Sequence, residues 1–239
     1  MLPIGDRDEP GPPAIVNLAI IALNVLVFVL LQLPNDAFTM GYSTIPFEIT
    51  TGQDLVGPQT VTLPDGTAGT IVEAPGPQPI WLTLFTSMFM HGGWLHIGGN
   101  MLFLFIFGDN VERAFGALKY IFFYLVCGLI ASLAQVFSDP SSVIPSLGAS
   151  GAISGVLAAY LVLFPRNPVR VLVAFRYVSE VPALAMIGLW ALLQFANALS
   201  GQTDGVAYMA HVGGFIAGLV LAFILRGTAS APGTSSQQP

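Results

Sequence analysis

The chain has 239 residues, of which 54% are hydrophobic and only 8% are charged, and its formal net charge is −6. Soluble domains carry roughly 25% charged residues. The composition therefore excludes a water-soluble fold of this length and indicates a protein that crosses a membrane several times. The single cysteine excludes an internal disulfide. The sequence contains no P-loop, zinc-ligand spacing or basic nucleic-acid patch, so we expect no cofactor, metal or nucleic-acid partner.

Six apolar segments follow one another along the chain, and each approaches the ~20 residues that a helix needs to cross a bilayer. They comprise about residues 14–33, 95–114, 118–137, 147–164, 181–199 and 208–225. We therefore predict an all-α polytopic membrane protein, a six-transmembrane-helix bundle with one membrane domain over residues 14–227. The flanking residues 1–13 and 228–239 are polar or rich in proline, glycine and serine, and we expect them to be disordered tails.

A long polar segment, about residues 34–80, separates the first two apolar segments. It contains Asp65-Gly66 between two runs of β-prone residues, a pattern that predicts a small hairpin. Structureless loops of this length are unusual and often functional. A solvated linker is the equally weighted alternative.

The basic residues predict the orientation of the helices. If the N-terminus is cytoplasmic, all of them fall in cytoplasmic segments, and the three outward connections carry none. By the positive-inside rule, both termini are then cytoplasmic. The seven basic residues are Arg7, Arg113, Lys119, Arg166, Arg170, Arg176 and Arg226.

Two polar residues stand inside apolar segments: Ser150 in the fourth and His211 in the sixth. A histidine in the hydrocarbon region is costly, which makes it a functional hypothesis that needs a partner. Both segments are rich in glycine, which lets helix backbones approach closely in lipid. We therefore expect the fourth and sixth helices to pack together. The packing glycines are Gly148, Gly151 and Gly155 in the fourth segment and Gly214 and Gly218 in the sixth.

Ser150 and His211 also lie at similar heights. Counting back from Arg166, Ser150 lies about 24 Å above the inner end of its helix at ~1.5 Å per residue. Counting back from Arg226, His211 lies about 22 Å up. The two side chains are therefore level within about one helical turn, roughly a third of the way down from the outer face, and a Ser–His hydrogen bond is geometrically reasonable.

The second apolar segment contributes His96 and Asn100, which are four residues apart and share one helix face. Measured from Arg113, they lie about 25 Å and 20 Å up, and so bracket Ser150 and His211. Polar side chains from three helices are thus predicted to converge at one depth.

This convergence predicts hydrolytic chemistry. Serine is a weak nucleophile until a base takes its proton, and histidine suits that role. Ser150 would attack, with His211 as general base and then general acid, in a dyad that lacks the usual carboxylate. The oxyanion would be stabilised by the Asn100 amide, the His96 ring N–H and the Ser150 backbone N–H.

At this point the residues resemble the rhomboid family of intramembrane serine proteases. The matching runs are Gly148-Ala-Ser-Gly151, Ala210-His-Val-Gly-Gly214 and His96-Ile-Gly-Gly-Asn100. The resemblance implies the bacterial-type six-helix form in a plasma membrane, with Ser150 as nucleophile and His211 as base. It also implies that His96 and Asn100 line the oxyanion hole, and that the substrates are single-pass membrane proteins cut near the outer membrane face.

The chain departs from the family at Ser154, four residues after Ser150, where relatives often carry an aromatic side chain that can stack on the catalytic histidine. Two alternatives stay open. One is a catalytically silent relative that binds membrane helices, which need not keep both Ser150 and His211. The other is a channel or transporter, which would require polar residues in the inner half of the bundle as well. The sequence leaves the oligomeric state open.

Overall fold

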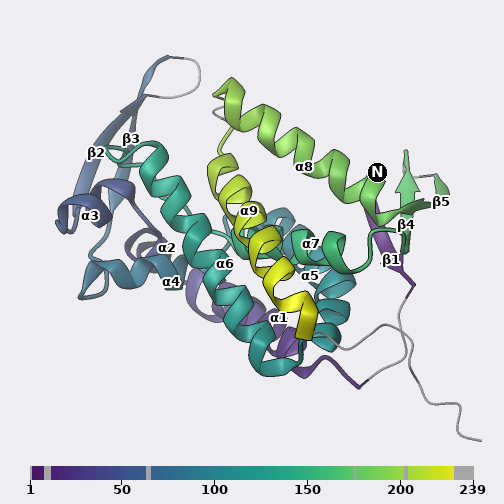
Figure 1. Cartoon of the computed structure of the whole chain (residues 1–239). Coiled ribbons are helices and arrows are strands. Elements are labelled where there is room, and N and C mark those ends of the chain that lie inside the picture. The colour runs from purple at the N-terminus through teal and green to yellow at the C-terminus, as the bar shows by residue number, and fades with distance from the viewer. Residues whose placement is uncertain (1, 8–11, 63–65, 175, 202–203, 229–239) are drawn as a thin grey trace, which may run out of the picture.

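The computed structural model describes residues 2–7, 12–62, 66–174, 176–201 and 204–228. Figure 1 shows a bundle of long helices with one small sheet at either end. The long helices are α1 (Ile15–Val27), continued by η1 (Phe28–Gln32), α5 (Trp94–Phe115), α6 (Ala117–Ser138), α7 (Ser150–Leu163), α8 (Ala183–Ser200) and α9 (Tyr208–Leu225).

Within the described part of the chain, four helices are long and apolar enough to cross a membrane. They are Ile15–Gln32, Ala117–Ser138, Ala183–Ser200 and Tyr208–Leu225. The helix α5 carries acidic and basic residues at its C-terminal end, and α7 has only 14 residues. A polytopic membrane protein is thus confirmed. Of the six predicted spans, four correspond to helices that are long and apolar enough to cross a membrane.

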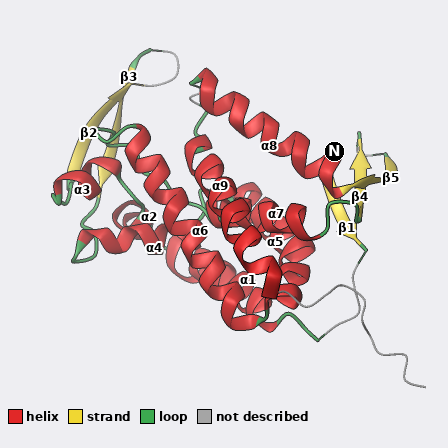
Figure 2. Cartoon of the chain, viewed as in Figure 1, coloured by secondary structure: helices red, strands yellow, loops and turns green. Residues whose placement is uncertain are grey.

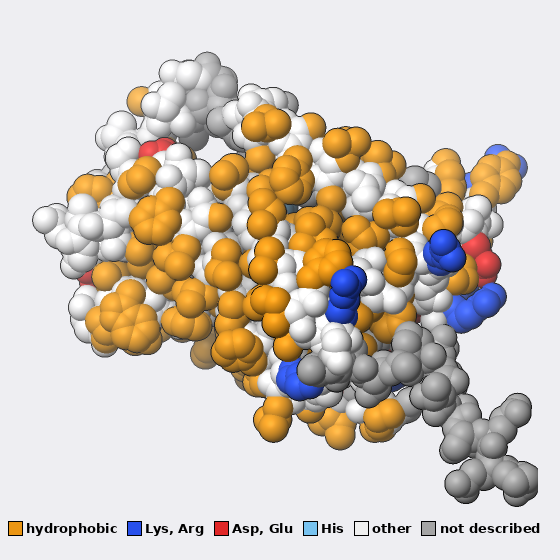
Figure 3. Space-filling view, viewed as in Figure 1, with side chains coloured by type: hydrophobic (Ala, Val, Ile, Leu, Met, Phe, Trp, Pro, Cys, Tyr) orange, Lys and Arg blue, Asp and Glu red, His pale blue; other side chains and the backbone are white. Residues whose placement is uncertain are grey.

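The surface of the bundle suits a lipid environment. In Figure 3, hydrophobic side chains spread over the middle of the visible face, while Lys and Arg side chains gather toward one end. The helix α8 is the extreme case, because only 22% of its span is buried inside the protein. Exposed apolar surface of this extent marks a face that meets lipid or another apolar partner.

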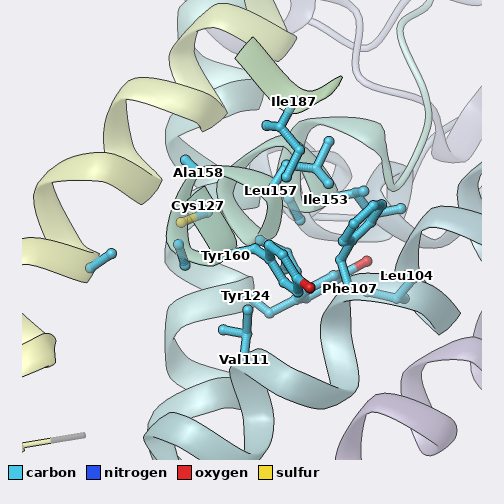
Figure 4. Packing of buried hydrophobic residues seen from close by; sticks show 14 of the residues in the cluster. Leu104, Phe107, Val111, Tyr124, Cys127, Ile153, Leu157, Ala158, Tyr160 and Ile187 are labelled. Carbon is cyan, nitrogen blue, oxygen red and sulfur yellow. The ribbon is translucent and has the colours of Figure 1, made fainter. Parts of the chain in front are cut away.

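The short helix α7 forms the centre of the bundle, with every residue from Gly151 to Tyr160 buried. It packs against α5, α6, α8 and α9. The chain just before it is irregular, and its residues 145–148 are half-buried. Figure 4 shows the apolar core around α7, where Phe107, Tyr124 and Leu157 meet. Cys127 is fully buried in the same cluster and behaves as a small apolar residue.

Glycine contacts set the approach of α7 to α9. A Cβ atom on Gly214 would overlap the backbone carbonyl of Gly151, and one on Gly218 would overlap the backbone of Gly155. A Cβ on Gly155 would in turn lie 2.6 Å from the Cys127 side chain. The structure therefore brings the glycines of the fourth and sixth predicted segments into direct backbone contact, as their spacing indicates.

The long segment between α1 and α5 is folded over its described residues and is not a solvated linker. It contains α2 (Asp36–Tyr42), α3 (Pro46–Thr51), the strands β2 (Gly57–Thr62) and β3 (Ala68–Glu73), and the short helices η2 (Ile80–Leu82), α4 (Thr83–Thr86) and η3 (Ser87–Phe89). The strands β2 and β3 pair antiparallel, which confirms the hairpin predicted around Asp65-Gly66, although Asp65 itself lies outside the described residues.

A second sheet makes the all-α prediction wrong (Figure 2). Its strands β1 (Leu2–Asp6), β4 (Pro168–Val173) and β5 (Tyr177–Pro182) pair antiparallel in the order β1-β4-β5. Val169 and Val171 are fully buried and alternate with the exposed Arg170, the pattern of a half-buried strand.

The pairing of β1 also corrects the prediction that residues 1–13 form a disordered tail, because Leu2–Asp6 is a strand. Residues 1 and 8–11 of that tail lie outside the described residues, and so do residues 229–239 of the predicted C-terminal tail. Asp6 accepts hydrogen bonds from Asn110 of α5, at 2.8 Å, and from the Tyr160 hydroxyl of α7. The strand is therefore attached to both a neighbouring hairpin and the helices.

Polar contacts also tie α1, α5 and α6 together. The Glu112 carboxylate accepts from the backbone N–H groups of Val16, at 3.1 Å, and Asn17, at 2.6 Å. It thereby caps the N-terminus of α1, where N–H groups lack partners within the helix. The Asn17 amide donates to the Leu104 carbonyl and accepts from the Tyr120 hydroxyl. Glu112 is thus a helix cap supplied by a different helix.

Candidate active site

Ser150 is the first residue of α7, so it lies where N–H groups of the helix have no intrahelical carbonyl partner. The preceding backbone takes a glycine-specific course, because Gly148 has φ +141° and donates its N–H to the Ser87 carbonyl at 2.9 Å. A further strand-like contact joins Ser146 to Thr44, in the segment between α1 and α5. These contacts attach residues 146–148, just before Ser150, to the segment between α1 and α5.

His211 lies on α9 and faces Ser150. The distance between His211 Nε2 and Ser150 Oγ is 2.8 Å, which is a hydrogen bond. The sequence predicts that these two residues lie at similar heights in their helices. The other ring nitrogen, Nδ1, lies 2.7 Å from Oε1 of Gln194 on α8. An amide oxygen only accepts, so Nδ1 carries the proton and Nε2 has the free lone pair. Nε2 therefore accepts from the Ser150 hydroxyl.

Two aromatic rings flank the histidine. The Trp190 ring of α8 lies 6.0 Å from the His211 ring between centroids, and the Tyr208 ring lies 6.3 Å away. Ser154 has no ring to pack against His211, and its hydroxyl donates to the Ser150 carbonyl at 2.6 Å. The aromatic packing on the His211 ring thus comes from Trp190 of α8 and Tyr208 of α9.

His96 of α5 approaches the Ser150 hydroxyl at Gly148. Its ring atoms Cε1 and Nε2 come within 3.0 Å of the point that a Cβ on Gly148 would occupy, and Ser150 Oγ comes within 3.4 Å of the same point. The His96 Nδ1 accepts from the Gly92 N–H at 3.2 Å, so its proton is on Nε2. The ring therefore presents an N–H donor toward the region of Ser150.

Asn100 is one turn further along the same face of α5. It is buried, and its amide nitrogen has no hydrogen-bond partner among the described residues. A buried donor without a partner is costly, so such groups call for a functional explanation. Asn100 thus offers a second donor on the helix face that carries His96.

The position of α5 is itself fixed by a clamp from η1. The Gln32 side chain accepts from the backbone N–H of His91 at 2.8 Å and donates to its carbonyl at 3.1 Å. This paired contact holds the turn that leads into α5, and with it the first turn that carries His96.

A small cavity of about 20 Å³, enough for a single water, borders Ser150 and is lined by Ser87, Ser132 and Ser146.

The structure thus brings together Ser150 and His211 by direct contact, and His96 by its approach to Gly148. For Asn100 it provides the shared helix face and the unused donor. Sequence reasoning missed Gln194 and Trp190. The available signal was a glutamine within an apolar span, four residues after a tryptophan and therefore on the same helix face.

The fold and this site define a class: a polytopic membrane protein with a hydrogen-bonded, half-buried serine and histidine between its helices. The Rhomboid domain model matches residues 78–228, and the chain therefore belongs to the rhomboid family. Members of this family are generally intramembrane proteases. The resemblance stated from the sequence motifs is confirmed.

Several curated relatives match the chain. RHOMBOID-like protein 5 of Arabidopsis thaliana is 33% identical over 142 residues, which cover 59% of this chain and 43% of that protein. RHOMBOID-like protein 4 of the same plant is 29% identical over 212 residues, 86% of this chain and 51% of that protein. Rhomboid-like protein 11, chloroplastic, also from Arabidopsis thaliana, is 32% identical over 162 residues, with 64% and 55% covered. The chain spans about half the length of these relatives.

Proposed function

We propose that the chain is an intramembrane serine endopeptidase that cuts single-pass membrane proteins near the outer membrane face. The observation that carries the proposal is the 2.8 Å hydrogen bond between Ser150 Oγ and His211 Nε2. Membership of a family of proteases supports the same activity. No metal or cofactor is needed, because the two side chains supply a nucleophile and a base.

The proposed reaction follows the geometry of the site. As Ser150 Oγ bonds to the scissile carbonyl carbon, its proton passes to His211 Nε2. The resulting oxyanion is stabilised by the His96 ring N–H, the Asn100 amide and the Ser150 backbone N–H at the start of α7. Collapse breaks the C–N bond, and the protonated His211 gives its proton to the leaving amine. A water molecule then hydrolyses the ester by the same proton route.

The proposed setting is a six-helix domain over residues 14–227, with both termini in the cytoplasm of a bacterial-type plasma membrane. The distribution of basic residues supports this orientation. Ser150 then lies within the outer third of the bilayer. A substrate helix would have to expose its backbone at that depth to reach the serine, which favours segments that unwind easily near their outer end.

The test is cleavage by the purified protein in liposomes, using a panel of single-pass model substrates and a fluorophosphonate probe. We expect Ser150→Ala and His211→Ala each to abolish cleavage, and Ser150→Ala to abolish labelling, while both variants keep the wild-type melting temperature in detergent. Ser138→Ala, at the exposed end of α6, is the matched serine control and should cut normally. Cleavage that persists in both dyad variants would contradict the proposal. A folded wild type that neither cuts nor labels would favour a silent, helix-binding relative.

A further inference from the structure

Gln194 is an unusual residue for its position. It lies in α8, the most exposed of the candidate spans, among Trp190, Leu192, Leu193 and Phe195. A polar amide in an apolar helix is unfavourable unless it finds a hydrogen-bond partner. The partner in this structure is His211, whose Nδ1 lies 2.7 Å from Gln194 Oε1. The helix face that turns inward from lipid thus presents one acceptor to the proposed base.

That acceptor decides which nitrogen of His211 is protonated. A neutral imidazole has one donor and one acceptor nitrogen, and their assignment follows the hydrogen bond that the ring makes. With Nδ1–H bound to Gln194, Nε2 faces Ser150 as an acceptor, 2.8 Å from its hydroxyl. The opposite tautomer would present Nε2–H to Ser150 and could not take its proton.

The contact also strengthens when the reaction advances. Once His211 has taken the serine proton, both ring nitrogens carry hydrogen and the ring is positively charged. A hydrogen bond from a charged donor is roughly twice as strong as a neutral one. Gln194 Oε1 would then favour the charged intermediate over the resting state, which is the requirement for a contact that raises the rate.

Packing keeps the two partners in register. Trp190, one turn before Gln194 on α8, lies 6.0 Å from the His211 ring and 6.3 Å from Phe215 of α9 between centroids. Phe195 adds an edge contact to Phe215 at 6.4 Å. Trp190, Gln194 and Phe195 of α8 therefore contact the turn of α9 that runs from His211 to Phe215. Ser154 cannot replace them, because its hydroxyl is engaged with the Ser150 carbonyl.

Resting on the proposed function, we infer that Gln194 is a positioning residue. It fills the place of the carboxylate in a catalytic triad with a neutral amide, and it sets the tautomer of His211 from a helix at the edge of the bundle. In a serine protease, a wrong tautomer of the histidine costs about 10⁴ in kcat. Because a neutral amide orients the ring without a full charge, we expect a smaller loss here.

The test combines steady-state kinetics with ¹⁵N NMR of the histidine rings in detergent, His211 being assigned by comparison with His211→Ala. For Gln194→Leu, we expect kcat to fall by about 10²- to 10³-fold with KM changed less than about threefold, and His211 to lose its Nδ1–H tautomer. Gln194→Glu keeps an acceptor oxygen and should recover more than about tenfold over the leucine variant. Leu193→Ala, on the exposed side of the same helix, is the control and should leave kcat unchanged.

A purely structural role predicts a different pattern. In that case Gln194→Leu would lower the melting temperature but leave kcat and the tautomer as in the wild type, and this result would overturn the inference. The NMR measurement needs no substrate. A wild type that cuts nothing would therefore sink the proposed function, while the tautomer of His211 in Gln194→Leu would still decide whether Gln194 sets it.

Discussion

Gly218 of α9 lies so close to Gly155 of α7 that a Cβ on Gly218 would overlap the Gly155 backbone. The two helices that carry His211 and Ser150 are therefore in backbone contact about two turns further along α9 from His211. Any side chain at this point must push the helices apart, and with them the two ends of the Ser–His hydrogen bond.

The first prediction concerns this contact. Gly218→Val should destabilise the protein by about 1–3 kcal/mol, the usual range for an overpacked core, and should lower kcat because Ser150 and His211 separate. Thermal unfolding in detergent and the cleavage rate would measure the two effects. Gly188→Val on α8 is the matched control, since a Cβ there meets nothing within 4 Å. Equal losses from both exchanges would contradict the packing argument.

The second prediction concerns His96 and Asn100, the proposed oxyanion donors. Removing one such donor typically costs about 10²–10³ in kcat. His96→Ala and Asn100→Ala should each lower kcat by about this factor with little change in KM, because the donors act on charge that develops only in the transition state. Rapid covalent labelling of Ser150 with unchanged cleavage in both variants would assign the two residues to packing instead.

The third prediction concerns pH and the folded segment between α1 and α5. Glu48 of α3 and Glu73 of β3 are each 2% exposed, and the Glu73 carboxylate has no hydrogen-bond partner among the described residues. Burial, opposed by the Leu55 N–H and assisted by Asp54, raises the pKa of Glu48 from 4.5 to about 7. Burial, and next the Glu48 charge, raises the pKa of Glu73 from 4.5 to about 7.

A raised carboxyl pKa means that the folded segment holds its protons more tightly than the unfolded chain. The contribution to stability is therefore complete below about pH 4.5 and is lost as the pH rises through about 7. Hydrogen exchange over residues 46–76 should accelerate from pH 5 to pH 8 beyond its intrinsic pH dependence. Glu73→Gln should flatten that excess, whereas the exposed Glu180→Gln should not. A slope that survives Glu73→Gln would refute the assignment.

The fourth prediction concerns the cap that α5 gives to α1. Glu112→Ala leaves two backbone N–H groups without their acceptor, and should destabilise the protein by about 1–3 kcal/mol. Glu112→Gln keeps one acceptor oxygen and should lose less. Melting temperatures in detergent measure both, with the exposed Asp139→Ala as the reference. An equal loss of stability in the alanine and glutamine variants would show that Glu112 stabilises the protein by packing and not by these hydrogen bonds.

Much of the helical core could be predicted from the sequence, because a span of lipid-facing residues leaves a long apolar signal. The prediction for residues 208–225 coincides with α9, and that for 118–137 differs from α6 by one residue at each end. The sequence predicts the fourth segment from residue 147, whereas α7 begins at Ser150, because Gly148 has a positive φ that is incompatible with an α-helix.

The sheets escaped prediction for a different reason. The strands β4 and β5 are short and lie between two helices, in a stretch whose basic residues indicated only a polar connection. The strand β1, which pairs with β4, lies before α1 and is far from β4 in the sequence, and pairing over such a distance leaves no local pattern. The contact between Gln194 and His211 was missed likewise, since the rotation of α8 about its axis depends on packing against α9.

The three-stranded sheet has a consequence for the order of assembly. During synthesis β1 is made before α1, but the strand beside it, β4, begins only at Pro168, after α1, α5, α6 and α7 have been made. The strand β1 therefore cannot pair with β4 until these four helices have been made. Closure of the sheet joins the strand that precedes α1 to the connection that precedes α8, so the sheet is completed only after these four helices have been made.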